Sequence, residues 1–474
     1  MLKYNFKYDF KLLLRSRWIQ LLSILLLLLF TFSVINGKQK VEKRSSDIAT
    51  VKNEIEESDN KVLKLLDSIA QGQKVKASRW TIPTSPMAVG NYHPRVAAME
   101  PQPFAFIATG QSDLYTSYIK PTVSGDDFAL NFTEMTSPVQ LLFGSFDLTF
   151  VIVYLLPLLI IAFSYNVLSA ERESGSLRLL ASQPIKIQTW VLQKLGLRFF
   201  WLSILAIGAL LIVFLILGVD LFAQFSVFLE LIALTLTYML FWFSLAFVIN
   251  VWSGSSAKNA VSMLGLWVIF VLLTPSLLNQ LGSSLYPMPS RTLMINEMRT
   301  KKLEVSKKQN EILDNFLRDH PEYAINDPKQ SRGFYHRYMA SQELVKKELA
   351  PILESYELQL KKQQDLVNQM KWFSPALAMQ ESLNKLAGTS SADYEGYRNQ
   401  VVNFAEAWRD YLIPFLYNNK KISKDDFKNL PEFQYQQGAG ITSITALALL
   451  LISIGLVVIG FLISKGIQKK TGLA

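Results

Sequence analysis

The residues that usually carry catalysis are sparse in this chain of 474 residues. A phosphate-binding loop of the form GxxxxGK(S/T) holds phosphates with backbone amides and a lysine. The only Gly-Lys pair, Gly37-Lys38, has Phe32 where the first glycine would stand. HExxH and GxSxG motifs are also missing from the sequence. We therefore predict that the chain is not an enzyme and does not bind ATP through such a loop.

Metal and thiol chemistry are disfavoured as well. The three histidines, His93, His320 and His336, are far apart and lack the spacing of metal ligands, so ordinary surface histidines are the better interpretation. The chain has no cysteine, which excludes disulfides, thiol catalysis and cysteine metal sites. We predict no metal site and no cofactor in this chain.

A short charged stretch between two apolar runs is the remaining candidate for function. Ser164 to Lys194 reads SYNVLSAERESGSLRLLASQPIKIQTWVLQK. Pro184 suits the first turn of a helix and disfavours helix at the residue before it. We therefore predict a short amphipathic helix, with Leu177 and Leu180 on its apolar face, then a break and a run into the next apolar segment. The stretch is too short to form a domain.

The elements around this stretch are those of a membrane protein. Half of the residues are hydrophobic and 18% are charged, against about 25% in soluble domains. Crossing about 30 Å of hydrocarbon takes about 20 apolar residues in a helix. Six windows qualify: 18–35, 148–168, 199–219, 221–251, 260–281 and 441–463. We predict an α-helical integral membrane protein with six transmembrane helices, the first an uncleaved anchor rather than a signal peptide.

Basic residues orient the predicted spans. An even number of spans places segments 1–17, 169–198, 252–259 and 464–474 on one side, where 14 basic residues stand against three acidic ones. This excess indicates the cytoplasmic side, so both termini are predicted to be cytoplasmic. The basic residues that give the pI near 9.3 then lie at a membrane face, where anionic lipid attracts them. Nucleic acid is therefore not an expected partner. Within 1–17, residues 2–14 predict an interfacial amphipathic helix, with a frayed basic tail as the alternative.

Two long segments, 36–147 and 282–440, would lie outside the cytoplasm. The first has apolar residues every seven positions, at Val41, Ile48, Ile55, Val62 and Ile69. This repeat predicts a helix of about thirty residues that packs on a partner helix. Short strands are predicted at 104–108 and 128–132, which makes the first segment a mixed α/β domain.

The second long segment is predicted to be mainly helical. Apolar residues at three- and four-residue spacing predict helices at 305–317 and 344–370. A return that changes from helical to irregular structure is expected over 372–431.

Three residues inside the predicted spans stand out. Glu230 is the one ionisable residue in the six windows. We place it near the outer end of its window, with 221–229 in the interface, because no Lys, Arg or His within the spans pairs with it; a proton-relay carboxylate is the alternative. Pro157 and Pro275 free backbone carbonyls that neighbouring helices can satisfy, and we predict bends there.

Residues 171–186, ERESGSLRLLASQPIK, resemble the signature of ABC-2 type transporter permeases. That signature is approximately E-x-E-x-G-(S/T)-L-x-x-L-x-(S/T)-x-P-(V/I), then a basic residue and a distal Gly-Lys, which Gln193-Lys194 replaces here. In that family the stretch is the coupling helix, which docks in a groove on a separate ATPase subunit. The resemblance implies an ABC-2 (type V exporter-like) permease fold. The coupling residues it implies are Glu171, Arg172, Glu173, Gly175, Leu177, Leu180, Pro184 and Lys186.

The same resemblance implies the partners and the location. We expect an ABC ATPase subunit that carries ATP and magnesium, a second permease copy or paralogue, membrane lipid and an extracytoplasmic protein, in the bacterial cytoplasmic (inner) membrane. Two roles stay open for Glu171 and Glu173. They face basic residues of the ATPase, or they cap the start of their own helix through its dipole.

A narrower likeness lies in the two long segments. Residues 101–114 (PQPFAFIATGQSDL), with 372–375 (WFSP) and 386–389 (LAGT), resemble a bacterial subfamily that has two large extracytoplasmic insertions. It is related to permeases of copper-enzyme maturation and gliding machinery, and it implies no substrate. Three functions therefore stay open: an exporting permease, a mechanotransmitting complex that moves its outer domains without cargo, and a membrane-anchored receptor or scaffold.

Overall fold

A computed structural model describes most of the chain. The described residues are 2–75, 78, 81–110, 112, 116–125, 146–177, 186–216, 218–220, 222–319, 321, 334–437 and 443–471. The strand predicted at 128–132 and two predicted coupling residues, Leu180 and Pro184, lie outside these ranges.

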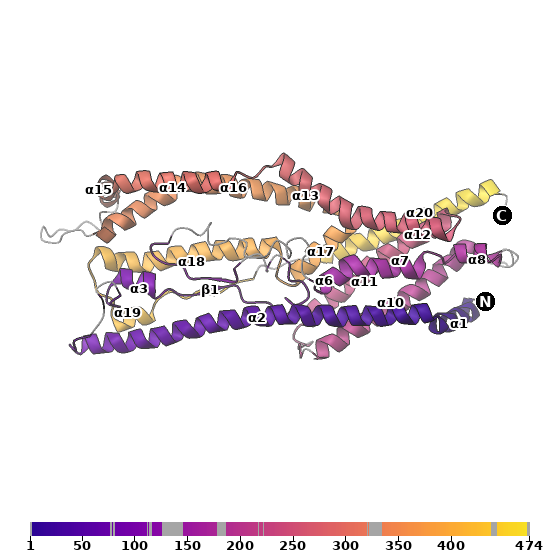
Figure 1. Cartoon of the computed structure of the whole chain (residues 1–474), viewed down its shortest axis with the longest axis horizontal. Coiled ribbons are helices and arrows are strands. Elements are labelled where there is room, and N and C mark those ends of the chain that lie inside the picture. Colours follow the sequence, from indigo (N-terminus) through magenta and orange to yellow (C-terminus); the bar gives the residue numbers. More distant parts are fainter. Residues whose placement is uncertain are drawn as a thin grey trace.

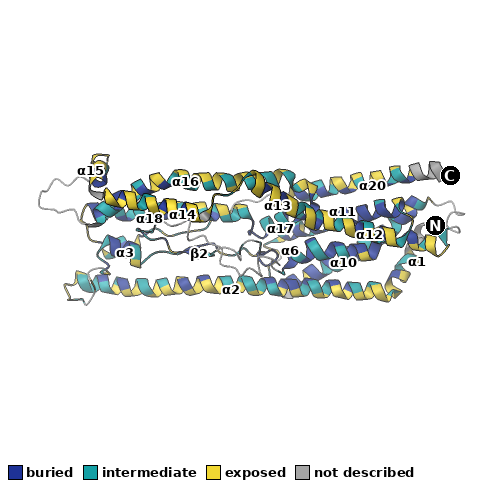
Figure 2. Cartoon of the chain, turned by 45° about the horizontal axis from the view of Figure 1, so that its top comes forward, coloured by how far each residue is buried: buried dark blue, intermediate teal, exposed yellow. Residues whose placement is uncertain are grey.

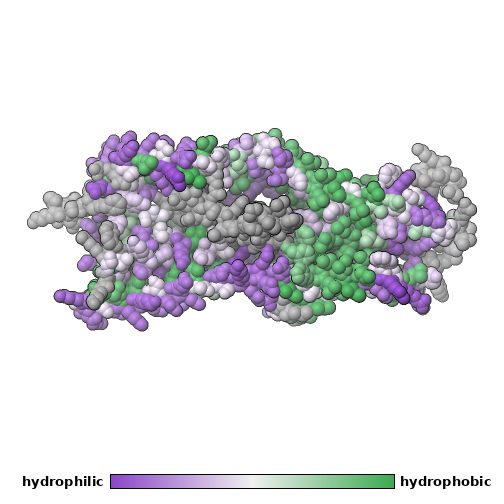
Figure 3. Space-filling view, in the orientation of Figure 1, coloured by the Kyte–Doolittle hydropathy of each residue, from purple (hydrophilic) through white to green (hydrophobic). Residues whose placement is uncertain are grey.

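The molecule is long, with a helical bundle at one end and a loop domain, residues 38–125 and 286–437, at the other (Figure 1). Within the described ranges, six helical stretches are long and apolar enough to cross a membrane: Arg17–Ala70, Leu148–Glu173, Ile187–Leu215, Phe225–Trp252, Ser256–Leu285 and Ser443–Lys465. Each covers most of one predicted window, so the prediction of six helices that are long and apolar enough to span a membrane is confirmed. Apolar side chains form a band over the bundle, with polar surface on both sides of it (Figure 3).

Both ends of the chain lie at one end of the bundle. The start of α1 (Leu2–Arg15) and the end of α20 (Ser443–Thr471) lie there beside α8 (Ser169–Glu173) (Figure 1). We call this the basic end, because it holds the segments with the excess of basic residues. The predicted helix at residues 2–14 is present as α1.

α2 (Arg17–Ala70) is one unbroken helix of 54 residues that runs from the basic end through the bundle and along the loop domain (Figure 1). It has no proline and a single glycine, Gly37. Beyond Gly37 one face is buried and the opposite face is exposed (Figure 2). The buried residues are Ile48, Val51, Val62 and Leu66. The long helix predicted from the seven-residue repeat is therefore confirmed.

The partner expected for this helix differs from the prediction. In place of a second long helix, α2 packs on the mostly non-helical 93–120 segment and on the short helix α19 (Lys424–Lys428). Ion pairs join α2 to both of these elements: Arg95 Nη1 lies 2.6 Å from Asp59 Oδ2, and Lys424 Nζ lies 2.6 Å from Asp67 Oδ2. Burial raises the pKa of Asp59, and Arg95 offsets part of this rise.

Spans two and five each contain a π-helical segment next to a proline. Their elements are α6 (Leu148–Phe150), η1 (Val151–Leu155) and α7 (Leu156–Ser164), and α12 (Ser256–Trp267), η2 (Val268–Leu273) and α13 (Thr274–Leu285). Pro157 has no N–H for the Val153 carbonyl, and the Tyr238 hydroxyl donates to that carbonyl instead at 2.9 Å. The Ser374 hydroxyl donates to the Phe270 carbonyl in η2 at 2.5 Å. Neighbouring elements thus satisfy the irregular backbone, as a bilayer requires.

α11 (Phe225–Trp252) is the central helix of the bundle, beside α10 (Ile187–Ile216) and α20. Within its most apolar window 67% of the residues are buried, against 17% for the fifth and sixth spans, which therefore present most of their surface to their surroundings (Figure 2). α20 packs closely on α11, since a Cβ at Gly460 would lie 2.6 Å from the Phe247 ring. Glu230 lies in the second turn of α11.

The described part of the loop domain is mainly helical. Its elements after α2 are α3 (Pro86–Tyr92), β1 (Ala97–Ala98), β2 (Tyr118–Ile119), α14 (Arg291–Lys307), α15 (Gln309–Asp319), α16 (Phe334–Met370), η4 (Lys371–Phe373), α17 (Pro375–Leu386), α18 (Ser391–Tyr417) and α19. β1 and β2 pair antiparallel, with Ala97 opposite Ile119. The return over 372–431 is more helical than predicted, because α18 buries one face against α3 and β1. For example, the Tyr397 hydroxyl donates to the Ala97 carbonyl at 2.8 Å.

The strand predicted at 104–108 is wrong. The segment forms successive turns, in which the Ile107 N–H donates to the Phe104 carbonyl at 3.0 Å. The rings of Phe104 and Phe106 are each centred 5.2 Å from the ring of Phe214 in α10. The apolar residues of this segment are buried because they fill the end of the bundle, which requires no sheet.

The motifs of the two long segments meet at this end of the bundle. The Thr389 hydroxyl donates to the Ala108 carbonyl at 2.8 Å. The N–H and the hydroxyl of Thr109 donate to the Asp147 carboxylate at 2.9 and 3.0 Å. Burial raises the pKa of Asp147, although these donors favour its charged form. We call residues 104–109 the plug, because they close the loop-domain end of the bundle.

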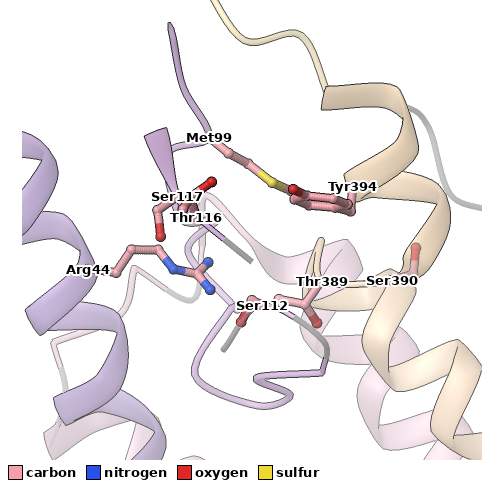
Figure 4. A pocket seen from close by; sticks show the side chains of 8 residues that line it. All are labelled: Arg44, Met99, Ser112, Thr116, Ser117, Thr389, Ser390 and Tyr394. Atoms are coloured by element: carbon pink, nitrogen blue, oxygen red, sulfur yellow. The ribbon is translucent and has the colours of Figure 1, made fainter. Parts of the chain in front are cut away.

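A small cavity lies beside the plug, between α2 and the start of α18 (Figure 4). Arg44 of α2 points toward Ser112 and Ser117, and Tyr394 of α18 lies on the opposite side (Figure 4). The cavity measures about 20 Å³, which is enough for about one water molecule. A cavity of this size is too small for a ligand larger than water.

Gly37 tests the contact between α2 and the plug. A Cβ at position 37 would lie 2.1 Å from the Phe106 carbonyl oxygen, whereas a Cβ at Gly208 in α10 would meet nothing within 4 Å. We expect Gly37→Ala to destabilise the protein by about 1–3 kcal/mol, because overpacking shifts the backbone. Gly208→Ala should not destabilise it. The thermal midpoint of the purified full chain in detergent measures both, and equal midpoints would contradict this contact.

Candidate functional site at the basic end of the bundle

The candidate site begins where span two stops being helical. α7 ends at Ser164, and residues 165–168 form turns before α8 begins. Asn250 of α11 lies against this break. Its amide nitrogen donates to the Ser164 carbonyl at 2.9 Å, and its amide oxygen accepts from the Leu168 N–H at 3.2 Å. Asn250 thus supplies partners for backbone groups that would otherwise be buried without any.

A second asparagine, Asn259 of α12, holds the same break. Its amide nitrogen donates to the Tyr165 carbonyl at 2.8 Å. The hydroxyls of Ser169 and Ser256 are hydrogen-bonded at 2.8 Å. Asn250 and Asn259 are both fully buried. Spans four and five therefore fix the place where α8 leaves the bundle.

Glu171 connects three elements through one lysine. Its carboxylate accepts from Lys194 Nζ of α10 at 2.9 Å and from the Ser176 hydroxyl. The same Nζ lies 3.9 Å from Asp9 Oδ1 of α1 and 4.0 Å from the centre of the Trp190 ring. Lys194 and Asp9 are each 16% exposed, so water screens this pair less than a surface ion pair. Burial raises the pKa of Asp9, and the nearby cations of α10 offset part of this rise.

Glu173 connects α8 to span five. Its carboxylate accepts from the Ser256 N–H at 2.7 Å and from the Ser256 hydroxyl at 2.9 Å. Ser256 is the first residue of α12, where unpaired N–H groups favour a negative charge. Glu173 therefore caps a different helix from its own.

The turn after α8 is the exposed part of the site. Residues 172–175 are exposed, and Gly175 has φ +77°, a backbone conformation that side chains other than glycine rarely adopt. Leu177 is half-buried and packs on the core of the bundle. Lys186 is exposed directly before α10. The described coupling residues thus form an exposed turn whose two flanks are attached to the bundle.

Sequence reasoning missed several residues that hold this turn. They are Asp9, Lys194, Asn250, Ser256 and Asn259. The two asparagines carried a usable signal, because a polar amide in or beside an apolar window needs a buried partner. Nothing in the local sequence identifies Ser256 as the partner of Glu173, since the two lie 83 positions apart.

Comparison with known proteins adds one finding for the loop domain. A family model described as Domain of unknown function (DUF3526) matches residues 291–436, which run from α14 to beyond α19 and do not include 171–186. A comparison with curated proteins finds no match. The fold and this match together define a multi-span membrane protein with a DUF3526 region in its loop domain.

Asn250→Leu tests how the break in span two is held. The substitution removes the partners of the Ser164 carbonyl and the Leu168 N–H. We expect a loss of about 1–3 kcal/mol, the cost of buried polar groups left unsatisfied. Thr237→Val is the matched control in the same helix, because the Thr237 hydroxyl bonds to carbonyls of its own helix. Thermal midpoints in detergent compare the two, and a loss no larger than the control's would refute this role.

Proposed function

We propose that the chain is the permease subunit of an ABC-2 type transporter in a bacterial cytoplasmic membrane, with both termini cytoplasmic. A separate ATPase, which holds ATP and magnesium, docks on residues 171–186 and drives export. The observation that supports this most is the exposed stretch 172–175, where Glu173 and the preceding Glu171 bind other helices of the bundle.

The contacts of the turn give a route for force. A push on the turn reaches α10 and α1 through Glu171 and Lys194, and it reaches α12 through Glu173 and Ser256. Single ion pairs contribute little, but here they add to the buried hydrogen bonds of Asn250 and Asn259. The turn and the ends of these helices should therefore move together.

Export would further require the plug to open. Phe104 and Phe106 pack on the ring of Phe214, and Thr389 holds the plug from the second long segment. A relative shift of α10 and α2 would separate these groups. A second permease copy or paralogue would complete the pathway.

Mechanotransmission is the second candidate, and α2 favours it. An unbroken helix of 54 residues is roughly 80 Å long and joins the basic end to the far part of the loop domain. Its first turns contact α1, which also bears Asp9. In this version ATP hydrolysis tilts α2 and moves the loop domain against an extracytoplasmic protein, and no cargo passes.

Docking is tested by copurification. We expect the wild-type chain to copurify with a P-loop ATPase when both are expressed from the native host. Arg172→Glu, at an exposed position, and Gly175→Val, which strains the turn, should each reduce the recovered ATPase roughly tenfold, equivalent to about 1.4 kcal/mol of binding free energy. Lys347→Glu is the control, because Lys347 is exposed in the loop domain. If no ATPase accompanies the wild type, the transporter proposal fails and a receptor or scaffold becomes the better account.

A second measurement separates the two candidates. In reconstituted vesicles that contain the complex, export predicts that ATP drives solute across the membrane. Mechanotransmission predicts that ATP changes hydrogen exchange in the distal part of α2 and in α18 while no solute crosses. ATP-driven solute movement would contradict pure mechanotransmission.

A further inference from the structure

A groove of about 560 Å³ lies at the basic end, where α11 ends and α12 begins. It is lined by Trp252, Ser253, Gly254, Ala257, Lys258, Val261 and Ser262. Because span five begins at Ser256, this groove lies at the level where the bundle meets one surface of the bilayer. α8 contacts the first residue of α12 beside this groove, through the hydrogen bonds of Glu173 to Ser256.

The charges around the groove favour an anion. Lys258 is exposed at the groove. A Cβ at Gly254 would lie 3.1 Å from Arg172 Nη1, which places a second cation against the same loop. The acidic neighbour, Glu173, is already bound to the N–H and the hydroxyl of Ser256. Lys258 and Ser262 thus line the groove, and Arg172 lies against the loop at its edge.

The groove continues into an apolar strip on span five. Val261 is 70% exposed, and Leu264 and Val268 are also exposed. These residues are three and four positions apart, so they share one face of the helix. Trp252, exposed at the mouth of the groove, is a residue type that gathers where membrane meets water. The site therefore offers a cationic end beside Ser262 and an apolar strip that continues from it along span five.

We propose that this groove binds one anionic phospholipid. The phosphodiester binds Lys258 beside Ser262, and an acyl chain lies along Val261, Leu264 and Val268. A lipid fits this site better than a second copy of the chain or an ATPase does. Its anionic headgroup complements the cationic end, and its acyl chain matches the apolar strip that continues from that end. The bound lipid fixes the depth of the start of α12, and with it the Glu173 contact. This inference holds whether or not an ATPase docks.

Lipid retention by the purified full chain tests the proposal. The chain is exchanged into mixed micelles of phosphatidylglycerol and phosphatidylcholine, and the lipids bound are counted by native mass spectrometry. We expect the wild type to retain one phosphatidylglycerol in preference to phosphatidylcholine. Lys258→Ala should weaken that retention about fivefold, the effect of one basic residue at an anionic surface. Lys258→Arg should preserve it.

Lys186→Ala is the matched control, because Lys186 is exposed on the same side and lies outside the groove. Equal retention by the wild type, Lys258→Ala and Lys186→Ala would overturn the proposal. A photo-reactive residue in place of Val261, activated in native membranes, gives an independent readout at an exposed position that folding tolerates. Adducts with phospholipid support the site. Adducts with a second copy or with another protein overturn it.

Discussion

The break in span two is the feature on which the rest of the structure depends. In a bilayer every backbone polar group must find a partner within the protein, so a helix can stop inside the bundle only if side chains replace its lost hydrogen bonds. Asn250 and Asn259 do this for residues 164–168. Once the break is fixed, α8 is positioned so that its carboxylates reach Lys194 and Ser256.

At the opposite end of the bundle, side chains again supply hydrogen-bond partners for irregular backbone. The plug is irregular backbone held by Asp147, Thr149 and Thr389. The plug and Thr389 lie far apart in the sequence. The hydrogen bond from the Thr389 hydroxyl to the Ala108 carbonyl joins them. The bundle is thus bounded by two irregular segments, one exposed at the basic end and one packed against spans one and three.

The sequence predicted what depends on local pattern. The six candidate spans, the long helix α2 and the carbonyl that Pro157 leaves for a neighbouring helix follow from apolar length, a seven-residue repeat and a missing N–H. The strand at 104–108 failed because burial in the bundle produced the same apolar run that a strand would show.

The candidate site was half predictable. The charged stretch predicted a short amphipathic helix with a break at Pro184, whereas α8 ends at Glu173 and the chain turns at Gly175. The partners of Glu171 and Glu173 could not be predicted, because they come from α10 and α12 and are set by how the spans pack. Facing an ATPase and capping their own helix were the two roles considered, and the structure adds a third, attachment of the turn to the bundle.

The central claim, that an ATPase drives the bundle at this turn, is tested most directly by cross-linking from the turn itself. Because the chain has no cysteine, a Ser174→Cys variant carries a single photo-reactive label at the exposed apex. The account predicts a covalent product with a P-loop ATPase in native membranes, and none from Lys347→Cys in the loop domain. A label at position 174 that reacts with lipid alone, in correctly folded protein, would contradict it.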